Sequence, residues 1–160
     1  MTTDREVIAG VDAFGAKAAA VIAAAEHSIA LLSVNLSRRL YAREDVTDAL
    51  MKFALHDERV LIRIIVADAR GATTGGNPFL EAARKLPSRI KLRELTPEMR
   101  DADGPEILIA DRKVMLELPD PSRLEAVFYP QATQRVLERM KHFEEAWNES
   151  EPGVELSGMR

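Results

Sequence analysis

The segment RVLIRIIVAD, residues 59–68, predicts the centre of the fold. It is rich in β-branched residues and is apolar on both faces apart from Arg63, a pattern typical of a strand that is covered on two sides. Such strands occur in α/β proteins, where helices pack against both faces of a sheet. The segment therefore predicts a central strand, with Asp68 just beyond its carboxyl end.

Helical and strand patterns alternate around this segment. Apolar residues at spacings of three and four predict a core-packing helix over residues 4–25, and HSIALLS, residues 27–33, predicts a strand. EDVTDALMKFAL, residues 44–55, predicts a second helix with Asp45 as its cap. This alternation implies right-handed crossovers and parallel strand pairs.

The second half of the chain predicts one more helix, a run of strands and a closing helix. NPFLEAARKLP predicts a helix that Asn77 caps and Pro87 stops. The later patterns predict strands over 89–95, 106–111, 113–118 and 123–130, with a tight hairpin at Asp111 and Arg112, then a helix over 131–150. The expected fold is a mixed, largely parallel sheet flanked by helices on both faces, in one domain of residues 1–150 followed by a flexible tail of residues 151–160.

Composition excludes several kinds of site. The chain of 160 residues has no cysteine, so disulfides, thiolate metal sites and a cysteine nucleophile are excluded. Its histidines, His27, His56 and His142, are widely spaced, so neither a metal site nor a catalytic triad is expected, and the sequence suggests no cofactor. The N-terminus lacks a signal-peptide pattern and no segment is apolar enough to span a bilayer, so we expect a cytoplasmic protein without membrane insertion.

Three segments resemble one half of a phospholipase D-like protein. Residues 23–50 look like that family's opening strand and helix, and residues 56–70 look like its second strand, which ends in Asp. Residues 105–118, PEILIADRKVMLEL, look like the strand and hairpin that carry the His-x-Lys-x-x-x-x-Asp signature. The resemblance covers roughly residues 22–130 and implies a phospholipase D-like half.

The resemblance also implies that the usual reaction is lost. If Asp111 is the signature Asp, the family's His falls on Gly104 and its Lys on Glu106. In the family, the His takes up the phosphoryl group and the Lys neutralises its oxygens. Glycine offers no nucleophile, and glutamate would repel the phosphate, at a cost of about 1 to 4 kcal/mol at roughly 4 Å.

Polar residues that follow two strands form the candidate ligand site. Ser33 and Asn35 follow one strand, and Asp68 and Arg70 follow the next, where open α/β sheets place their ligands. Arg70 would be the anion contact, and Asp111 would join this site or act electrostatically. The alternative is that these residues are only loop caps and that Asp111 only forms a turn.

Two further features could bind phosphate groups. Arg38 and Arg39, beside Tyr41, could form a patch for phosphate or nucleic acid, although similar clusters occur on many ordinary surfaces. The glycine- and threonine-rich loop of residues 71–78 leads into a helix N-terminus but lacks the lysine of a P-loop.

The sequence therefore favours a non-catalytic phospholipase D-like domain that binds or interacts, recognising a phosphate-type or other anionic ligand. The resemblance implies a homodimer, because the enzymes of the family bring two signature segments together. A phosphodiester hydrolase or nuclease that uses Asp68, Arg70 and Asp111 is the alternative. A nucleic-acid-binding module is a third possibility, which the net charge of −4 disfavours.

Overall fold

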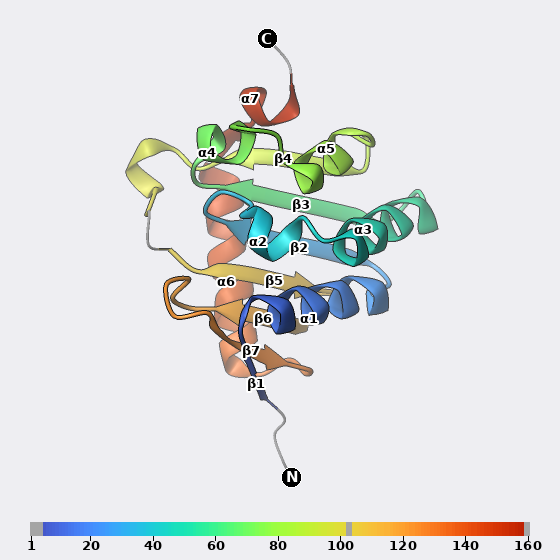
Figure 1. The fold of residues 1–160 in the computed structure, drawn as a ribbon, viewed down its shortest axis with the longest axis vertical. Helices are drawn as coiled ribbons and strands as arrows, with labels where there is room; N and C mark the ends of the chain where they lie inside the picture. Colours follow the sequence, from blue (N-terminus) through green and yellow to red (C-terminus); the bar gives the residue numbers. More distant parts are fainter. Residues whose placement is uncertain (1–4, 102–103, 159–160) are drawn as a thin grey trace.

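The computed structural model describes residues 5–101 and 104–158, which fold around one sheet (Figure 1). Within these residues the sheet has eight strands in the order β1-β7-β6-β5-β2-β3-β4-β8. The strands are β1 (Glu6–Ala9), β2 (Ser28–Ser33), β3 (Leu61–Val66), β4 (Ile90–Glu94), β5 (Glu106–Ala110), β6 (Val114–Leu118), β7 (Glu125–Tyr129) and β8 (Glu151–Pro152). The helices are α1 (Val11–Ala24), α2 (Arg38–Tyr41), α3 (Glu44–His56), α4 (Ala69–Thr73), α5 (Pro78–Arg84), α6 (Gln134–Glu149) and α7 (Val154–Ser157), with a 3-10 turn at Pro97–Met99.

The prediction of a largely parallel sheet is wrong. Only the β2–β3 and β3–β4 pairs within the described sheet are parallel, and the other five pairings are antiparallel. Parallel pairing needs a long crossover, and helices provide one only between β2 and β4. The short connections from β5 to β7 allow only antiparallel neighbours, and β5 also joins β2 antiparallel.

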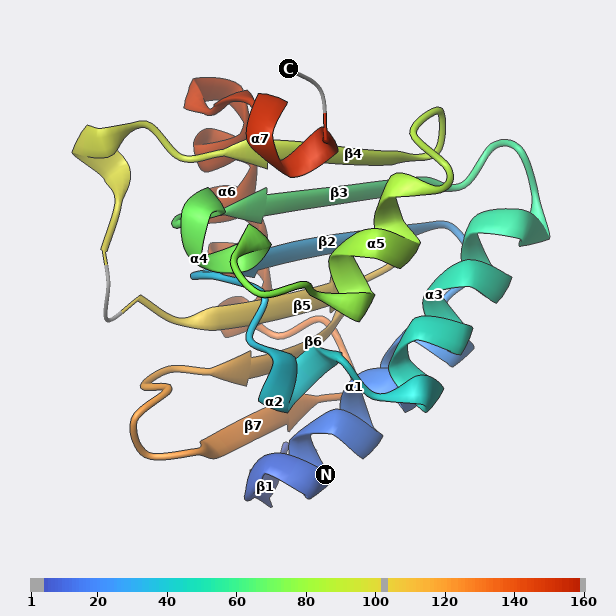
Figure 2. The ribbon, with the colours of Figure 1, turned by 45° about the horizontal axis from the view of Figure 1, so that its top comes forward.

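Helices cover both faces of the sheet, as predicted. One face carries α1, α3 and α5, whereas α6 crosses the strands on the other face (Figures 1 and 2). Alternate residues of each strand therefore enter two separate cores. Leu31, Ile64 and Leu108 belong to the core under α1 and α3, whereas Leu32, Ile65 and Ile107 belong to the core under α6.

The N-terminal prediction of one helix over residues 4–25 is wrong in its first part; residue 4 lies outside the described residues. Residues 6–9 form β1, in which Ile8 is buried and pairs with β7. Gly10, with φ of 96°, then turns the chain into α1. This left-handed conformation suits glycine, so Gly10 separates the two elements rather than merely weakening one helix.

Other elements match their predictions with local differences. Asn77 caps α5, since its side chain accepts hydrogen bonds from the Phe79 and Leu80 amides. Asp45 does not cap α3; it pairs instead with Arg43 at 3.0 Å. The structure adds α2, which no sequence pattern indicated.

The residues expected to form a flexible tail continue the fold. Residues 151–152 form β8 on the edge of β4, and α7 follows with Leu156 fully buried. Residues 159 and 160 of the expected tail lie outside the described residues. Among the residues that are described, no helix has the length and apolar character needed to cross a membrane.

Ion pairs join α6 to the sheet. The Glu117 carboxylate, on β6 and 1% exposed, accepts hydrogen bonds from Arg135 at 2.7 Å and from Arg139 at 2.6 Å. Arg63, on β3, donates two hydrogen bonds to Glu144, at 2.7 and 2.8 Å. The charged side chains Glu117 and Arg63 on this otherwise apolar face of the sheet are thus each paired with charged residues of α6.

Asp111 ties the β5–β6 hairpin to the start of β2. Its carboxylate accepts hydrogen bonds from the backbone amides of His27 at 2.7 Å, Ser28 at 3.1 Å and Glu26 at 3.0 Å. Burial acts to raise the pKa of Asp111, but these hydrogen bonds outweigh it and hold the pKa below its usual value of 3.8. Asp111 and Arg112 have φ of 56° and 63°, as a tight hairpin turn requires.

We predict that Asp111→Asn lowers the free energy of unfolding by about 1–2 kcal/mol at neutral pH, because charge-assisted hydrogen bonds to backbone amides are lost. The folded-state pKa of Asp111 is depressed, so its contribution is present above pH 3.8 and is lost as pH falls below that value. Urea unfolding at neutral and acidic pH measures this, with Asp48→Asn on the exposed face of α3 as the control. A difference between wild type and Asp111→Asn that stays constant with pH would contradict the role of the charge.

Candidate functional site

The carboxyl ends of β2 and β3 bring four of the predicted site residues to one edge of the sheet, the carboxyl edge. Ser33 and Val66 are paired at the end of the two parallel strands, and the Asp68 amide donates to the Val34 carbonyl at 2.6 Å. Asp68 caps α4 by accepting a hydrogen bond from the Gly71 amide at 2.9 Å. A Cβ atom built on Gly71 would lie 3.3 Å from the Cβ of Asn35, so Asn35 lies beside the first turn of α4.

Arg70 is the cation that this edge presents to solvent. It is exposed on α4, and its guanidinium forms no hydrogen bond or ion pair with the described residues. Asp68 is exposed beside it, but the cap to Gly71 occupies one of its carboxylate oxygens. Beside α4, the edge therefore offers the unpaired guanidinium of Arg70, together with the partly exposed Asn35.

Glu106, singled out in the sequence, lies at the same edge because β5 runs antiparallel to β2. The side chain is 2% exposed. Its Oε1 accepts a hydrogen bond from the Tyr41 hydroxyl at 2.6 Å, its Oε2 accepts one from the Val34 amide at 3.0 Å, and the Ser33 hydroxyl is a further partner. Burial raises the pKa of Glu106 above its usual value of 4.5, although these hydrogen bonds act in the opposite direction.

Tyr41 on α2 covers Glu106. Its ring packs against Phe14 and Phe79, with centroid separations of 5.8 and 5.5 Å. Burial, and then the nearby charge of Glu106, raise the pKa of Tyr41 well above 10.0. Leu36 is also fully buried, and its amide donates to the Ser33 hydroxyl at 2.9 Å. The sheet end beneath α2 is therefore filled by side chains of the protein itself.

Gly104 lies two residues before β5. Its amide donates to the Asp101 carbonyl at 3.0 Å, and a Cβ atom at this position would lie 3.0 Å from the same oxygen. That separation is shorter than ordinary van der Waals contact, so a larger residue would displace the Asp101 carbonyl. Residues 102 and 103 lie outside the described residues.

Arg38 and Arg39, the predicted phosphate patch, differ in their contacts. Arg38 donates hydrogen bonds to the carbonyls of Thr74 and Gly76, so it holds the glycine-rich loop in place. Arg39 is exposed, and its side chain has no partner among the described residues. Asn77 also joins this loop to the chain after β2, because its amide nitrogen donates to the Leu36 carbonyl at 2.9 Å.

Asp111 does not join the other predicted site residues. It lies at the far end of β5, where it binds the backbone at the start of β2, whereas Glu106 binds the backbone just beyond the end of β2. The antiparallel pairing of β5 with β2 places Glu106 and Asp111 at opposite edges of the sheet. The sequence predicted a largely parallel sheet and so did not reveal this separation.

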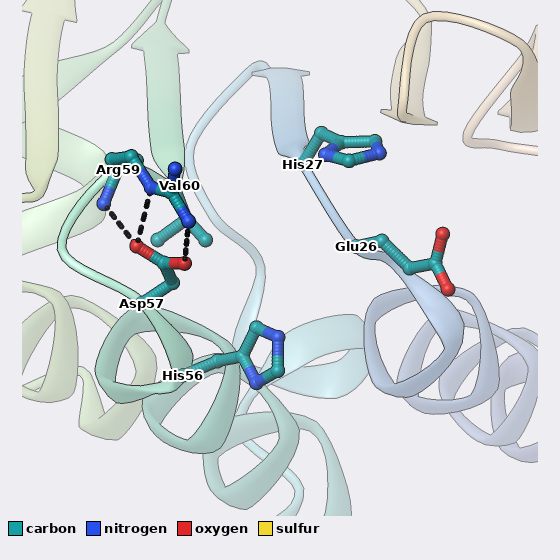
Figure 3. A pocket seen from close by; sticks show the side chains of 6 residues that line it. All are labelled: Glu26, His27, His56, Asp57, Arg59 and Val60. Carbon is teal, nitrogen blue, oxygen red and sulfur yellow. Dashed lines mark hydrogen bonds and ion pairs between the residues drawn. The ribbon is translucent and has the colours of Figure 1, made fainter.

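A cavity of 480 Å³ opens at this opposite edge, and sequence reasoning missed it (Figure 3). Its lining residues are Glu26, His27, His56, Asp57, Arg59 and Val60. Figure 3 shows His27 and His56 on different sides of the hollow, while Asp57 is bound by Arg59. The hydrogen bonds from Arg59 hold the pKa of Asp57 far below its usual value.

The chemistry of this cavity is limited. It brings together two imidazoles without a hydroxyl or thiol nucleophile. Among residues 5–101 and 104–158, no group of three or more histidine, aspartate or glutamate side chains is arranged to hold a metal ion. The only sequence signal for the cavity is that its residues flank the starts of β2 and β3, which a strand prediction alone does not connect.

Comparisons with solved structures confirm a phospholipase D-like fold. NucT from Helicobacter pylori is similar with a TM-score of 0.67 and 11% identity, over 93% of this chain and 98% of that chain. TrmBL2, an archaeal chromatin protein, is similar with a TM-score of 0.66 and 18% identity over 94% of this chain, which spans 55% of the TrmBL2 chain. Phosphatidylserine synthase from Haemophilus influenzae Rd KW20 is similar with a TM-score of 0.53 and 13% identity, over 96% of this chain and 40% of that chain.

These identities are low, so the likenesses establish the fold alone. No curated protein matches the sequence. One family model, the domain of unknown function DUF7931, matches residues 10–159. The chain therefore belongs to the DUF7931 family.

Proposed function

We propose that the chain is a non-catalytic phospholipase D-like binding domain whose carboxyl edge recognises a phosphate-type or other anionic group. One observation carries the proposal: Glu106 is buried at this edge with Tyr41 and Val34 as hydrogen-bond partners. In the signature that the sequence resembles, this position holds a lysine that faces phosphate oxygens.

The usual reaction would have neither its nucleophile nor its cation. At the position of the signature His, Gly104 has no side chain, and the nearby Asp101 carbonyl leaves little room for one. At the position of the Lys, the Glu106 carboxyl is bound to protein donors under an aromatic cover, so it neither attracts a phosphate nor meets one. These features support the loss of phosphoryl transfer at this half-site.

The exposed part of the same edge supports anion binding. Arg70 has an unpaired guanidinium on the outer side of α4, and the Asn35 amide lies beside the same helix. A guanidinium binds phosphate or carboxylate through two parallel hydrogen bonds. Arg39, on α2, is a second unpaired cation at this edge, whereas Arg38 is occupied by the loop carbonyls.

A nucleic acid is one source of such a phosphate group. The structure of TrmBL2 is described as showing a novel mode of DNA binding, and this chain is similar to it in fold. The net charge of −4 acts against a broad phosphate-backbone contact. The homodimer that the resemblance implied stays a prediction, as does the cytoplasmic location.

The proposal predicts no phosphodiester hydrolysis. Purified protein mixed with bis(4-nitrophenyl) phosphate should release nitrophenol no faster than buffer, because Gly104 supplies no nucleophile and a buried glutamate stands at the position of the signature Lys. Release above the blank that falls on Asp68→Asn but not on the control Asp48→Asn would contradict the proposal. That result would favour the alternative hydrolase.

The proposal also predicts that Arg70 carries anion binding. Inorganic pyrophosphate and a short single-stranded DNA oligonucleotide serve as probes. Their binding is measured from the shifts of the Asn35 and Gly71 backbone amides in NMR spectra. Arg70→Ala should weaken binding by about tenfold, the loss expected for one charge-assisted contact, and should reduce its salt dependence.

Lys52→Ala, which removes an exposed cation from α3, is the matched control and should leave affinity unchanged. Binding of both probes would point to the phosphate group itself, whereas binding of the oligonucleotide alone would favour a nucleic-acid module. Failure of both probes to shift these amides, or equal losses in the two variants, would refute anion recognition at this edge.

A further inference from the structure

A second cavity, of 460 Å³, lies where β7 ends and α6 begins. Tyr129, at the end of β7, pairs with Met115 near the start of β6, whereas Glu106 pairs with Leu118 at the other end of β6, so the cavity lies away from the carboxyl edge. Both of its charged lining residues are basic, and none is acidic. The lining residues are Arg5, Tyr129, Pro130, Gln131, Thr133, Gln134 and Arg135.

Tyr129 presents a hydrogen-bond donor to this cavity. The residue is 7% exposed and packs with Val136 and Met140 in the core beneath α6. Its hydroxyl forms no hydrogen bond within the described part of the chain, yet its oxygen is not sealed from solvent. Because this hydroxyl reaches solvent and has no partner within the described residues, it is a donor available to an occupant of the cavity.

The N-terminus of α6 supplies further donors. Thr133 caps the helix through its side chain, which accepts from the Val136 amide at 3.3 Å, and through its carbonyl, which accepts from Leu137. The amides of Gln134 and Arg135 precede these and have no intrahelical acceptor. The first turn of this 16-residue helix has no acidic residue, so the positive end of its dipole is uncompensated.

The two arginines add positive charge. Arg135 donates to Glu117 through Nε and Nη2, which leaves Nη1 without that partner. Arg139 also binds Glu117, so that carboxylate is shared between two guanidinium groups. Glu138 is a second carboxylate near Arg135, and it accepts a hydrogen bond from the Gln134 side chain at 3.4 Å, so Arg5 is the unpaired cation of the cavity. Arg5 is exposed, and its side chain has no partner among the described residues.

We propose that this cavity binds a small organic anion. Its carboxylate or phosphate group is held by Arg5, by Arg135 and by donors at the start of α6, with the Tyr129 hydroxyl as a further donor. Its apolar body lies against the Tyr129 ring and Pro130. The site is separate from the carboxyl edge and does not depend on the function proposed for that edge.

The test uses the full chain, with phenyl phosphate, benzoate and inorganic phosphate as probes in NMR titrations. Phenyl phosphate or benzoate should shift the backbone amides of Gln134 and Arg135. Tyr129→Phe keeps the ring and removes only the hydroxyl, and it should weaken binding by about tenfold. Arg5→Ala should weaken binding to a similar degree, and this exposed substitution leaves the core intact.

Two controls localise the site. Lys141→Ala removes an exposed cation further along α6, and Arg70→Ala removes the cation of the carboxyl edge; neither should change the affinity. The absence of shifts at Gln134 and Arg135, or losses as large in Lys141→Ala as in Arg5→Ala, would overturn the proposal. Equal affinity for phenyl phosphate and inorganic phosphate would overturn the role of the apolar body.

Discussion

The burial of the Glu106 carboxyl group is the constraint on which the carboxyl edge depends. A carboxyl group removed from water is costly unless donors surround it. Here the donors are the Tyr41 hydroxyl and the Val34 amide, and Ser33 is a further partner. Because Tyr41 must lie over β5 to donate, α2 is held across the end of the sheet. The aromatic contacts to Phe14 and Phe79 then join this cover to α1 and α5.

Carboxylates fix both ends of β5 to β2. Glu106 accepts from the amide just after β2, and Asp111 accepts from three amides around its start. The two contacts hold the antiparallel register of Ile107 with Leu32 and of Ala110 with Ile29. The segment that resembles a catalytic signature therefore has a structural role at each end. This division explains why the two acidic residues do not meet in one site.

Local sequence patterns predicted most helices and strands. They did not predict which strands pair, or that Tyr41 covers the carboxyl edge. The β-branched run of residues 59–68 correctly indicated the central strand, and Asn77 correctly indicated the start of α5. Parallel pairing was over-predicted, because the sequence does not show that β5 inserts beside β2 as an antiparallel neighbour. The switch at Gly10 was missed, since alternation over only four residues resembles one turn of a helix. The ends of β2 and β3 place Ser33, Asn35, Asp68 and Arg70 at one edge, and their role in binding a ligand stays a prediction. The cover by Tyr41 depends on a short helix without a sequence signature.

The most direct test of the burial of Glu106 beneath Tyr41 is a pH titration of the Glu106 side-chain carboxyl carbon, measured by NMR in protein labelled with carbon-13. The account predicts a midpoint above the usual 4.5, because burial disfavours the charged form more than its hydrogen bonds favour it. Tyr41→Phe should raise the midpoint further, since the hydroxyl stabilises the carboxylate. A midpoint at or below 4.5 that does not respond to Tyr41→Phe would mean that water reaches Glu106. That result would contradict the burial of Glu106 beneath Tyr41.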